Sequence, residues 1–250
     1  MKFLKQRLKE TVFEQLRKKG YRVERLSSQQ WRTYDDYHQQ ADLICRQHRQ
    51  QTQEDVAALR QKYQSPVLGK VRVWDLVEML GQCVDPGDRT LYCTSQFNHV
   101  LQMLAGMEKN GITDPDLYIA ALVHDLGKIL LLTGEAPENV VGGHHKPIGE
   151  YEPGIGLDNC TLQWDHGEFA YMRFKEYLPD GISWLIRYHA ILRKECEPFM
   201  DERDRAYTEK YLKPFYKYDC GTKSPYSLPK VDLAKYRDLV EERFPEPILF

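Results

Sequence analysis

The chain has 250 residues, of which 42% are hydrophobic, and this is enough apolar material for one substantial core. Its 35 basic and 37 acidic residues nearly balance, so no strongly basic face is predicted and nucleic acid is not an expected partner. Apolar runs such as 129–132 are too short to span a bilayer, and no secretory signal is apparent. Six scattered cysteines without a CxxC pair favour reduced thiols in a cytoplasmic protein.

Most periodic segments of the chain have the helical spacing of apolar residues, and strand-like alternation is scarce. Residues 1–30 are expected to form an amphipathic helical extension, and 31–250 a single all-α domain. The very polar stretch 30–63 is predicted to form one or two exposed helices. A short helix is predicted over 73–80, and it is followed by a strong turn at 85–88.

Helix start signals become clearer in the middle of the chain. Ser95 can cap a helix over the following apolar residues. Asp114 is a predicted N-cap, with Pro115 at the first helical position, and this helix leads to His124 and Asp125. These signals predict two adjacent core helices.

The last part of the chain begins with a long excursion over 134–156, rich in Gly, Pro, Glu and His. Loops of this length inside a compact domain are usually functional. Further helices are predicted at about 160–178, 182–192, 201–219 and 230–243. The outline is therefore all-α.

Four of the eight histidines fall inside apolar helical segments, where an unpaired imidazole is costly to bury. These four are His99, His124, His166 and His189. One such histidine is usually a hydrogen-bonded core residue. Four of them, with Asp125 directly after His124, favour a metal site instead. Nitrogen and carboxylate ligands without thiolate suit iron, manganese or zinc.

Several short segments occur in an order and spacing that point to a known family. They are His124-Asp125-Leu126-Gly127-Lys128, Gly134-Glu135, Val140-Val141-Gly142, Trp164-Asp165-His166-Gly167-Glu168, Ile186-Arg187-Tyr188-His189 and Phe215-Tyr216-Lys217-Tyr218-Asp219. From about residue 75 onward the chain resembles the myo-inositol oxygenase family, HD-domain proteins with a mixed-valent di-iron centre. The resemblance implies an HD-domain-like helical bundle around a buried di-metal site.

The resemblance also implies the ligands of that site. Two iron ions would share an oxo or hydroxo bridge, with O2 as co-substrate. One iron would take His99, His124, Asp125 and Asp219. The other would take His166 and His189, with Asp125 bridging the two.

Substrate contacts follow from the same resemblance, namely Lys128, Lys223, Asp85, Asp88 and Gly142. Lys128 would also be catalytic, because its ammonium favours a deprotonated substrate oxygen. Asp85 and Asp88 have a simpler explanation, since Asp-Pro-Gly-Asp is good turn chemistry. The pair His144-His145, shortly after Gly142, has no counterpart in the family. These two histidines are expected to be solvated side chains of the loop.

The resemblance implies a di-iron oxygenase that cleaves myo-inositol oxidatively to glucuronate, or that acts on a related small hydroxylated substrate. Gly143 and Ala190 stand where the family has aspartate and serine, so another molecule with adjacent chelating oxygens stays open. The expected partner is a small polyol or similar compound, with no membrane involved. We expect a monomer or weak oligomer.

Two other functions stay open at this point. An HD-type phosphohydrolase would use its metals to activate water, and four side chains could contact phosphate: His145, Lys146, Arg187 and Arg193. A catalytically silent binding protein could also have kept a metal-held fold.

Overall fold

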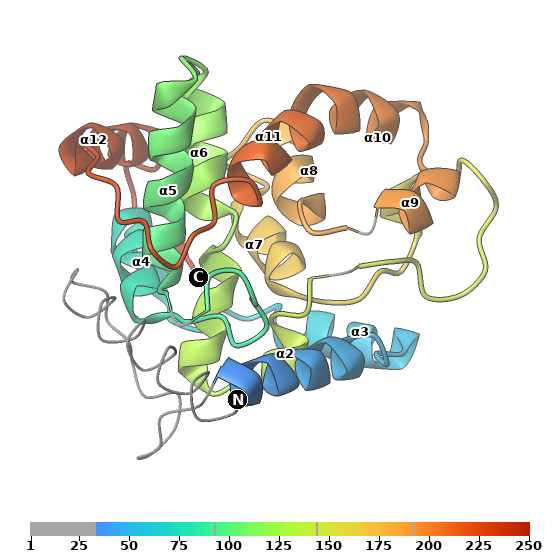
Figure 1. The fold of residues 1–250 in the computed structure, drawn as a ribbon. Helices are drawn as coiled ribbons and strands as arrows, with labels where there is room; N and C mark the ends of the chain where they lie inside the picture. The colour runs from blue at the N-terminus through green and yellow to red at the C-terminus, as the bar shows by residue number, and fades with distance from the viewer. Residues whose placement is uncertain (1–33, 93, 144, 192) are drawn as a thin grey trace.

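The computed structural model describes residues 34–92, 94–143, 145–191 and 193–250, and its regular structure is almost entirely helical (Figure 1). The helices are α2 (Tyr34–His48), α3 (Gln53–Lys62), α4 (Val73–Met79), α5 (Gln96–Lys109), α6 (Pro115–Val123), α7 (His166–Phe174), α8 (Asp180–Tyr188), α9 (Arg193–Cys196), α10 (Glu202–Tyr207), α11 (Lys213–Asp219) and α12 (Leu233–Arg243). The predicted all-α class is confirmed. The predicted extension 1–30 lies outside the described residues, so the division of the chain stays a prediction.

Short segments complete the fold. Five are 3₁₀ helices: η1 (Leu80–Gln82), η2 (Leu126–Thr133), η3 (Pro137–Asn139), η4 (Leu157–Asn159) and η5 (Glu197–Phe199). A π-helical turn, η6 (Thr208–Leu212), joins α10 to α11. The strands β1 (Lys70–Val71) and β2 (Ile248–Leu249) pair antiparallel. No described helix is long and apolar enough to cross a membrane.

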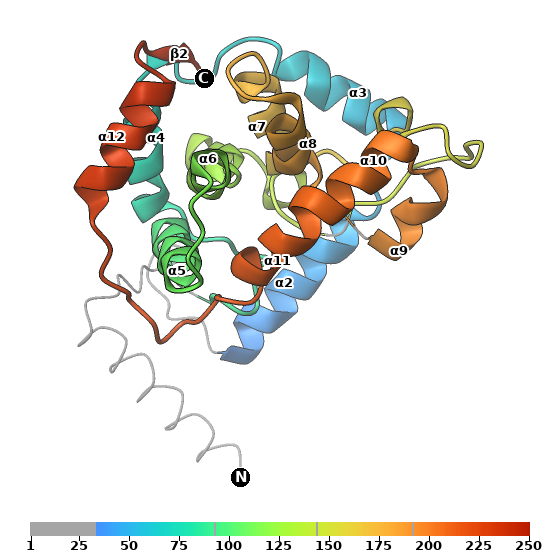
Figure 2. The ribbon, with the colours of Figure 1, turned by 90° about the horizontal axis from the view of Figure 1, so that it is seen from above.

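Helix α6 lies in the middle of the fold, with other helices around it (Figure 2). The side chain of Asp114 caps it by accepting a hydrogen bond from the Asp116 N–H at 2.9 Å, and Pro115 occupies its first turn. Residues 118–123 are all buried. A helix that is apolar on every side requires partners all round, and α5, α8 and α12 pack against α6.

Helix α2 is less exposed than its composition predicts. Tyr37, Ala41, Ile44 and His48 are buried at helical spacing along one face. That face packs against η3. The predicted helices are present, but the expected exposure does not hold for this face of α2, because one buried face is enough to dock a helix whose other faces are polar.

The start of η2 and the start of α7 touch each other closely, and this contact holds together two segments of the candidate site. A Cβ atom added at Gly127 would lie 2.0 Å from the carbonyl oxygen of His166. Only glycine permits this approach of backbone to backbone. The contact sets the position of Asp125 and Lys128 relative to His166.

Gly127→Ala is expected to destabilise the protein by about 3 kcal/mol, because the added methyl group forces η2 away from α7. Chemical denaturation followed by circular dichroism measures the loss. Gly81→Ala is the matched control, since nothing lies within 4 Å of the Cβ it would gain. Equal stability of the two variants would show that the Gly127 contact is not a constraint.

Candidate metal centre

Six predicted ligand residues meet in the interior, and most lie at helix ends. His99 is on α5, His124 follows α6, Asp125 precedes η2, His166 begins α7, His189 follows α8, and Asp219 ends α11. All six are buried. The fold therefore brings together side chains that are up to 120 residues apart in the sequence.

The carboxylate of Asp125 lies between two groups of imidazoles. Its Oδ2 is 3.3 Å from His124 Nε2 and 3.8 Å from His99 Nε2. Its Oδ1 is 3.2 Å from His166 Nε2 and 3.9 Å from His189 Nε2. Asp219 joins the first group, with Oδ1 3.1 Å from His99 Nε2. Each oxygen of Asp125 thus faces a separate set of nitrogen atoms.

Hydrogen bonds set the orientation of three of the imidazoles. Nδ1 contacts a backbone carbonyl in each case: His124 with Ala121 at 3.0 Å, His166 with Val140 at 2.8 Å, and His189 with Ile186 at 2.8 Å. Because a carbonyl only accepts, Nδ1 carries a hydrogen in each ring, and Nε2 presents a lone pair whenever the ring is neutral.

The Nε2 atoms of His166 and His189 are only 3.1 Å apart. This is a hydrogen-bonding distance when one ring carries a proton on Nε2, and a metal ion bound there would take the place of that proton. The Nε2 of His124 also has no hydrogen-bond partner among the described residues. Ligand atoms of His124, Asp125 and His189 lie within 4.8 Å of one another, as do those of a second group containing His99, His124 and Asp219. The donor set fits metal ions in both chemistry and spacing.

The imidazoles of the site differ in protonation. Burial opposes charge on His166, but Asp165 and Asp125 outweigh it and raise the pKa of that imidazole to about 10, so a metal ion bound there would replace a proton. Burial, together with the neighbouring His124 and His166, lowers the pKa of His189 to about 3. Burial opposes ionisation of Asp125, but His124 and Lys128 outweigh it and hold the pKa of that carboxyl well below its usual range. Neutral imidazoles and ionised carboxylates are the forms that bind metal ions.

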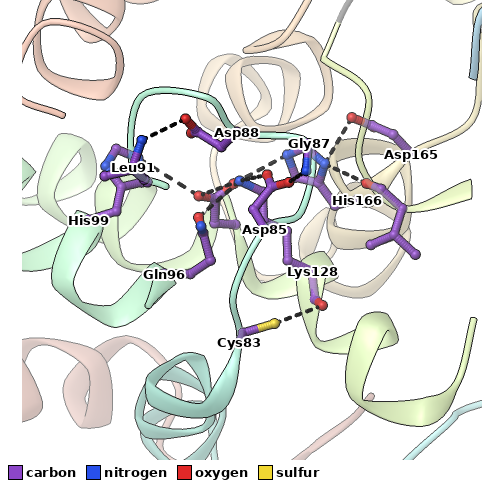
Figure 3. Close-up of polar contacts among 12 residues, drawn as sticks. Cys83, Asp85, Gly87, Asp88, Leu91, Gln96, His99, Lys128, Asp165 and His166 are labelled. Atoms are coloured by element: carbon purple, nitrogen blue, oxygen red, sulfur yellow. Dashed lines mark hydrogen bonds and ion pairs between the residues drawn. The ribbon is translucent and has the colours of Figure 1, made fainter. Parts of the chain in front are cut away.

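Lys128 lies beside Asp125, where its ammonium has three acceptors. Two of them, Asp85 and Gln96, are labelled beside Lys128 in Figure 3. Nζ is 3.1 Å from Asp125 Oδ2, 3.0 Å from Asp85 Oδ2 and 3.0 Å from Gln96 Oε1. Burial disfavours its charge, but Asp125 and Asp85 outweigh this and raise the pKa of Lys128. The residue is therefore a buried, charged and fully hydrogen-bonded lysine.

Lys223 occupies the corresponding place beside Asp219. Its Nζ is 3.5 Å from Asp219 Oδ1 and 3.0 Å from Asp88 Oδ2. The other oxygen of Asp88 accepts hydrogen bonds from the Thr90 and Leu91 N–H groups. Asp85 likewise uses Oδ1 for the Gly87 N–H at 2.7 Å. Asp85 and Asp88 therefore each stabilise the turn through one oxygen and form an ion pair with a lysine through the other.

A cavity of about 830 Å³ opens onto this cluster. All the predicted substrate contacts line it: Asp85, Asp88, Lys128, Gly142 and Lys223. Asp125, His166, His189 and Asp219 lie along the same cavity. Gly143 and Ala190 are part of its wall, which has no polar side chain at these positions. A Cβ atom at Gly142 would come 2.5 Å from the ring of His48, so glycine is required there.

Some residues near the cluster were missed or misjudged from the sequence. Gln96 was not predicted, although it follows the helix cap Ser95 and binds Lys128. His145 was expected to be solvated, but it is 3% exposed, with Nε2 2.6 Å from Asp165 Oδ2. Its partner in the prediction, His144, lies outside the described residues.

The side chains that would bind phosphate in a hydrolase mostly face elsewhere. Arg187 is paired with Glu168 and Asp158, each at 2.6 Å. Lys146 lies 3.6 Å from Glu195 and is not part of the cavity wall. Of the four candidates, only Arg193 lines the cavity.

Comparisons with known proteins agree with this geometry. A sequence model of the myo-inositol oxygenase family matches residues 38–149 and 135–250. Inositol oxygenase 1 of Arabidopsis thaliana is 30% identical over 238 residues, covering 79% of this chain and 76% of the plant protein. The inositol oxygenase of Homo sapiens is 26% identical over 236 residues, covering 79% of this chain and 82% of the human protein. The chain therefore belongs to the myo-inositol oxygenase family.

Proposed function

We propose that this protein is a di-iron oxygenase that uses O2 to cleave a carbon–carbon bond of myo-inositol or a closely related polyol. One oxygen atom of O2 enters the product, which is glucuronate in the case of myo-inositol, and the other leaves as water. The six clustered residues would hold two irons, and Asp125 faces both groups of ligand candidates. The names of the relatives from plants and human support the substrate class.

The observation that carries the proposal is the position of Asp125. Its two oxygens face two different sets of imidazoles, and the cluster lies along a large cavity. A carboxylate that faces ligands in two directions suits a bridge between two ions. The side of the cluster that faces the cavity leaves room for adjacent oxygens of a polyol.

The two irons supply the activation of O2 and the one-electron steps that oxidative ring opening requires. The protein supplies the charged and polar side chains around them. Lys128 places a buried positive charge next to Asp125 and the cavity, where it stabilises a substrate oxygen that has lost its proton. Lys223 and Asp88 offer a donor and an acceptor to a further hydroxyl group.

The glycines and the alanine of the cavity wall bear on the choice of substrate. Gly142, Gly143 and Ala190 offer no side-chain hydrogen bond to a polyol hydroxyl. A lost buried hydrogen bond costs about 1–3 kcal/mol, so preference among polyols depends on these positions. The type of reaction depends instead on the six clustered ligand residues.

The phosphohydrolase is the weaker alternative, because Arg187 is engaged in ion pairs with Glu168 and Asp158, and neither Arg187 nor Lys146 lines the cavity. A silent binding protein does not need a complete set of six ligand-type residues.

Oxygen uptake tests the function directly. Protein loaded with Fe(II) under anaerobic conditions is expected to consume O2 when myo-inositol or another polyol is added, and to form a sugar acid in equal amount. Metal-stripped protein is the control. Phosphate release from phosphomonoesters with manganese, without any demand for O2, would contradict the proposal and favour the hydrolase.

Lys128→Gln removes the buried positive charge while keeping a polar side chain. We expect kcat for oxygen uptake to fall by about 100-fold, because the stabilised substrate oxygen is lost. Iron content, measured in the same samples, should stay at the wild-type level. Lys146→Gln is the matched control and should match wild type in both measurements. An active Lys128→Gln variant would remove Lys128 from the mechanism.

A further inference from the structure

A buried carboxylate and a buried imidazole lie behind His166, on the side opposite Asp125. Asp165 is fully buried and His145 is 3% exposed. Asp165 Oδ2 lies 2.6 Å from His145 Nε2 and 3.0 Å from His166 Nδ1. Figure 3 shows Asp165 pointing at His166. Neither Asp165 nor His145 lines the cavity, so neither contacts substrate.

The Asp165 carboxylate is held in place through its first oxygen. Oδ1 accepts hydrogen bonds from the Gly167 N–H at 2.8 Å and the Glu168 N–H at 3.3 Å, and so caps helix α7. His166 is the first residue of that helix. The second oxygen is therefore fixed relative to the His166 backbone and faces the two imidazoles.

His145 is held from the other side. Its carbonyl oxygen accepts from Cys196 Sγ at 3.4 Å, and its backbone forms a parallel bridge with Ile191. The ring of His48 covers it, with ring centroids 5.3 Å apart, and His48 is itself fully buried. Water is thus kept away from Asp165, which strengthens its interaction with the imidazoles.

The carboxylate makes His166 different from the other imidazoles of the cluster. Nδ1 of His124 and of His189 contacts a backbone carbonyl. Nδ1 of His166 contacts both the Val140 carbonyl and the charged Asp165. A carboxylate behind a ligand imidazole fixes the tautomer and makes the opposite nitrogen a stronger donor to metal.

We propose that Asp165 and His145 are positioning residues that hold His166 with Nε2 toward Asp125 and strengthen it as a ligand for one of the two metal ions. This rests on the proposed function, since it takes His166 to be a metal ligand. The consequence is an asymmetric centre, in which the ion on the His166 side depends on Asp165 and the ion on the His99 side does not.

Anaerobic titration of metal-free protein with Fe(II), read by equilibrium dialysis, tests the asymmetry. Asp165→Asn keeps the helix cap, because asparagine caps as well as aspartate, but removes the charge. We expect one of the two positions to bind iron about 10–100-fold more weakly and the other to keep its affinity. His145→Gln should shift the same position in the same direction. Asp232→Asn, at the cap of α12, is the matched control and should change neither position.

The outcomes separate this inference from the function on which it rests. Wild-type affinity at both positions of Asp165→Asn and His145→Gln overturns the inference and leaves the proposed function intact. Wild-type protein that binds no iron overturns both. A purely structural role would lower the thermal midpoint of metal-free Asp165→Asn while the iron affinities stay unchanged, and this result too contradicts the inference. Should Asp165→Asn fail to fold, His145→Gln decides.

Discussion

The burial of Asp125 among four imidazoles is the constraint on which the rest of this structure depends. A carboxylate in the interior needs positive charge nearby. The ammonium of Lys128 contacts Asp125, but it is shared with Asp85 and Gln96. The imidazoles differ: burial and the neighbouring His124 and His166 lower the pKa of His189 to about 3, whereas Asp165 and Asp125 raise the pKa of His166 to about 10. Bound metal ions would replace the proton of His166 and add further positive charge, so we expect the site to be most stable when it is loaded.

The fold meets this constraint by placing the proposed ligands at the ends of its helices. His124 and His189 are the C-caps of α6 and α8, His166 opens α7, and Asp219 closes α11. At a C-cap the imidazole Nδ1 can bond a carbonyl three residues earlier, and this directs Nε2 outward from the helix. Hydrogen bonds within or next to the same helix thus orient two of the proposed ligands.

Local signals explain what the sequence predicts well. The caps Ser95 and Asp114 mark α5 and α6, and histidines inside apolar helices are costly enough to indicate ligands. The environment of His145 could not be predicted in this way, because Asp165 and the ring of His48 come from distant parts of the chain. The same holds for α2, whose buried face becomes apparent only through what it packs against. Tertiary contacts decide these cases.

A crystal structure of the protein loaded anaerobically with Fe(II), with anomalous differences measured at the iron absorption edge, tests the central claim most directly. The account predicts two iron peaks, one on the His99 and His124 side of Asp125 and the other on the His166 and His189 side. A single peak, or iron bound away from Asp125, would contradict it.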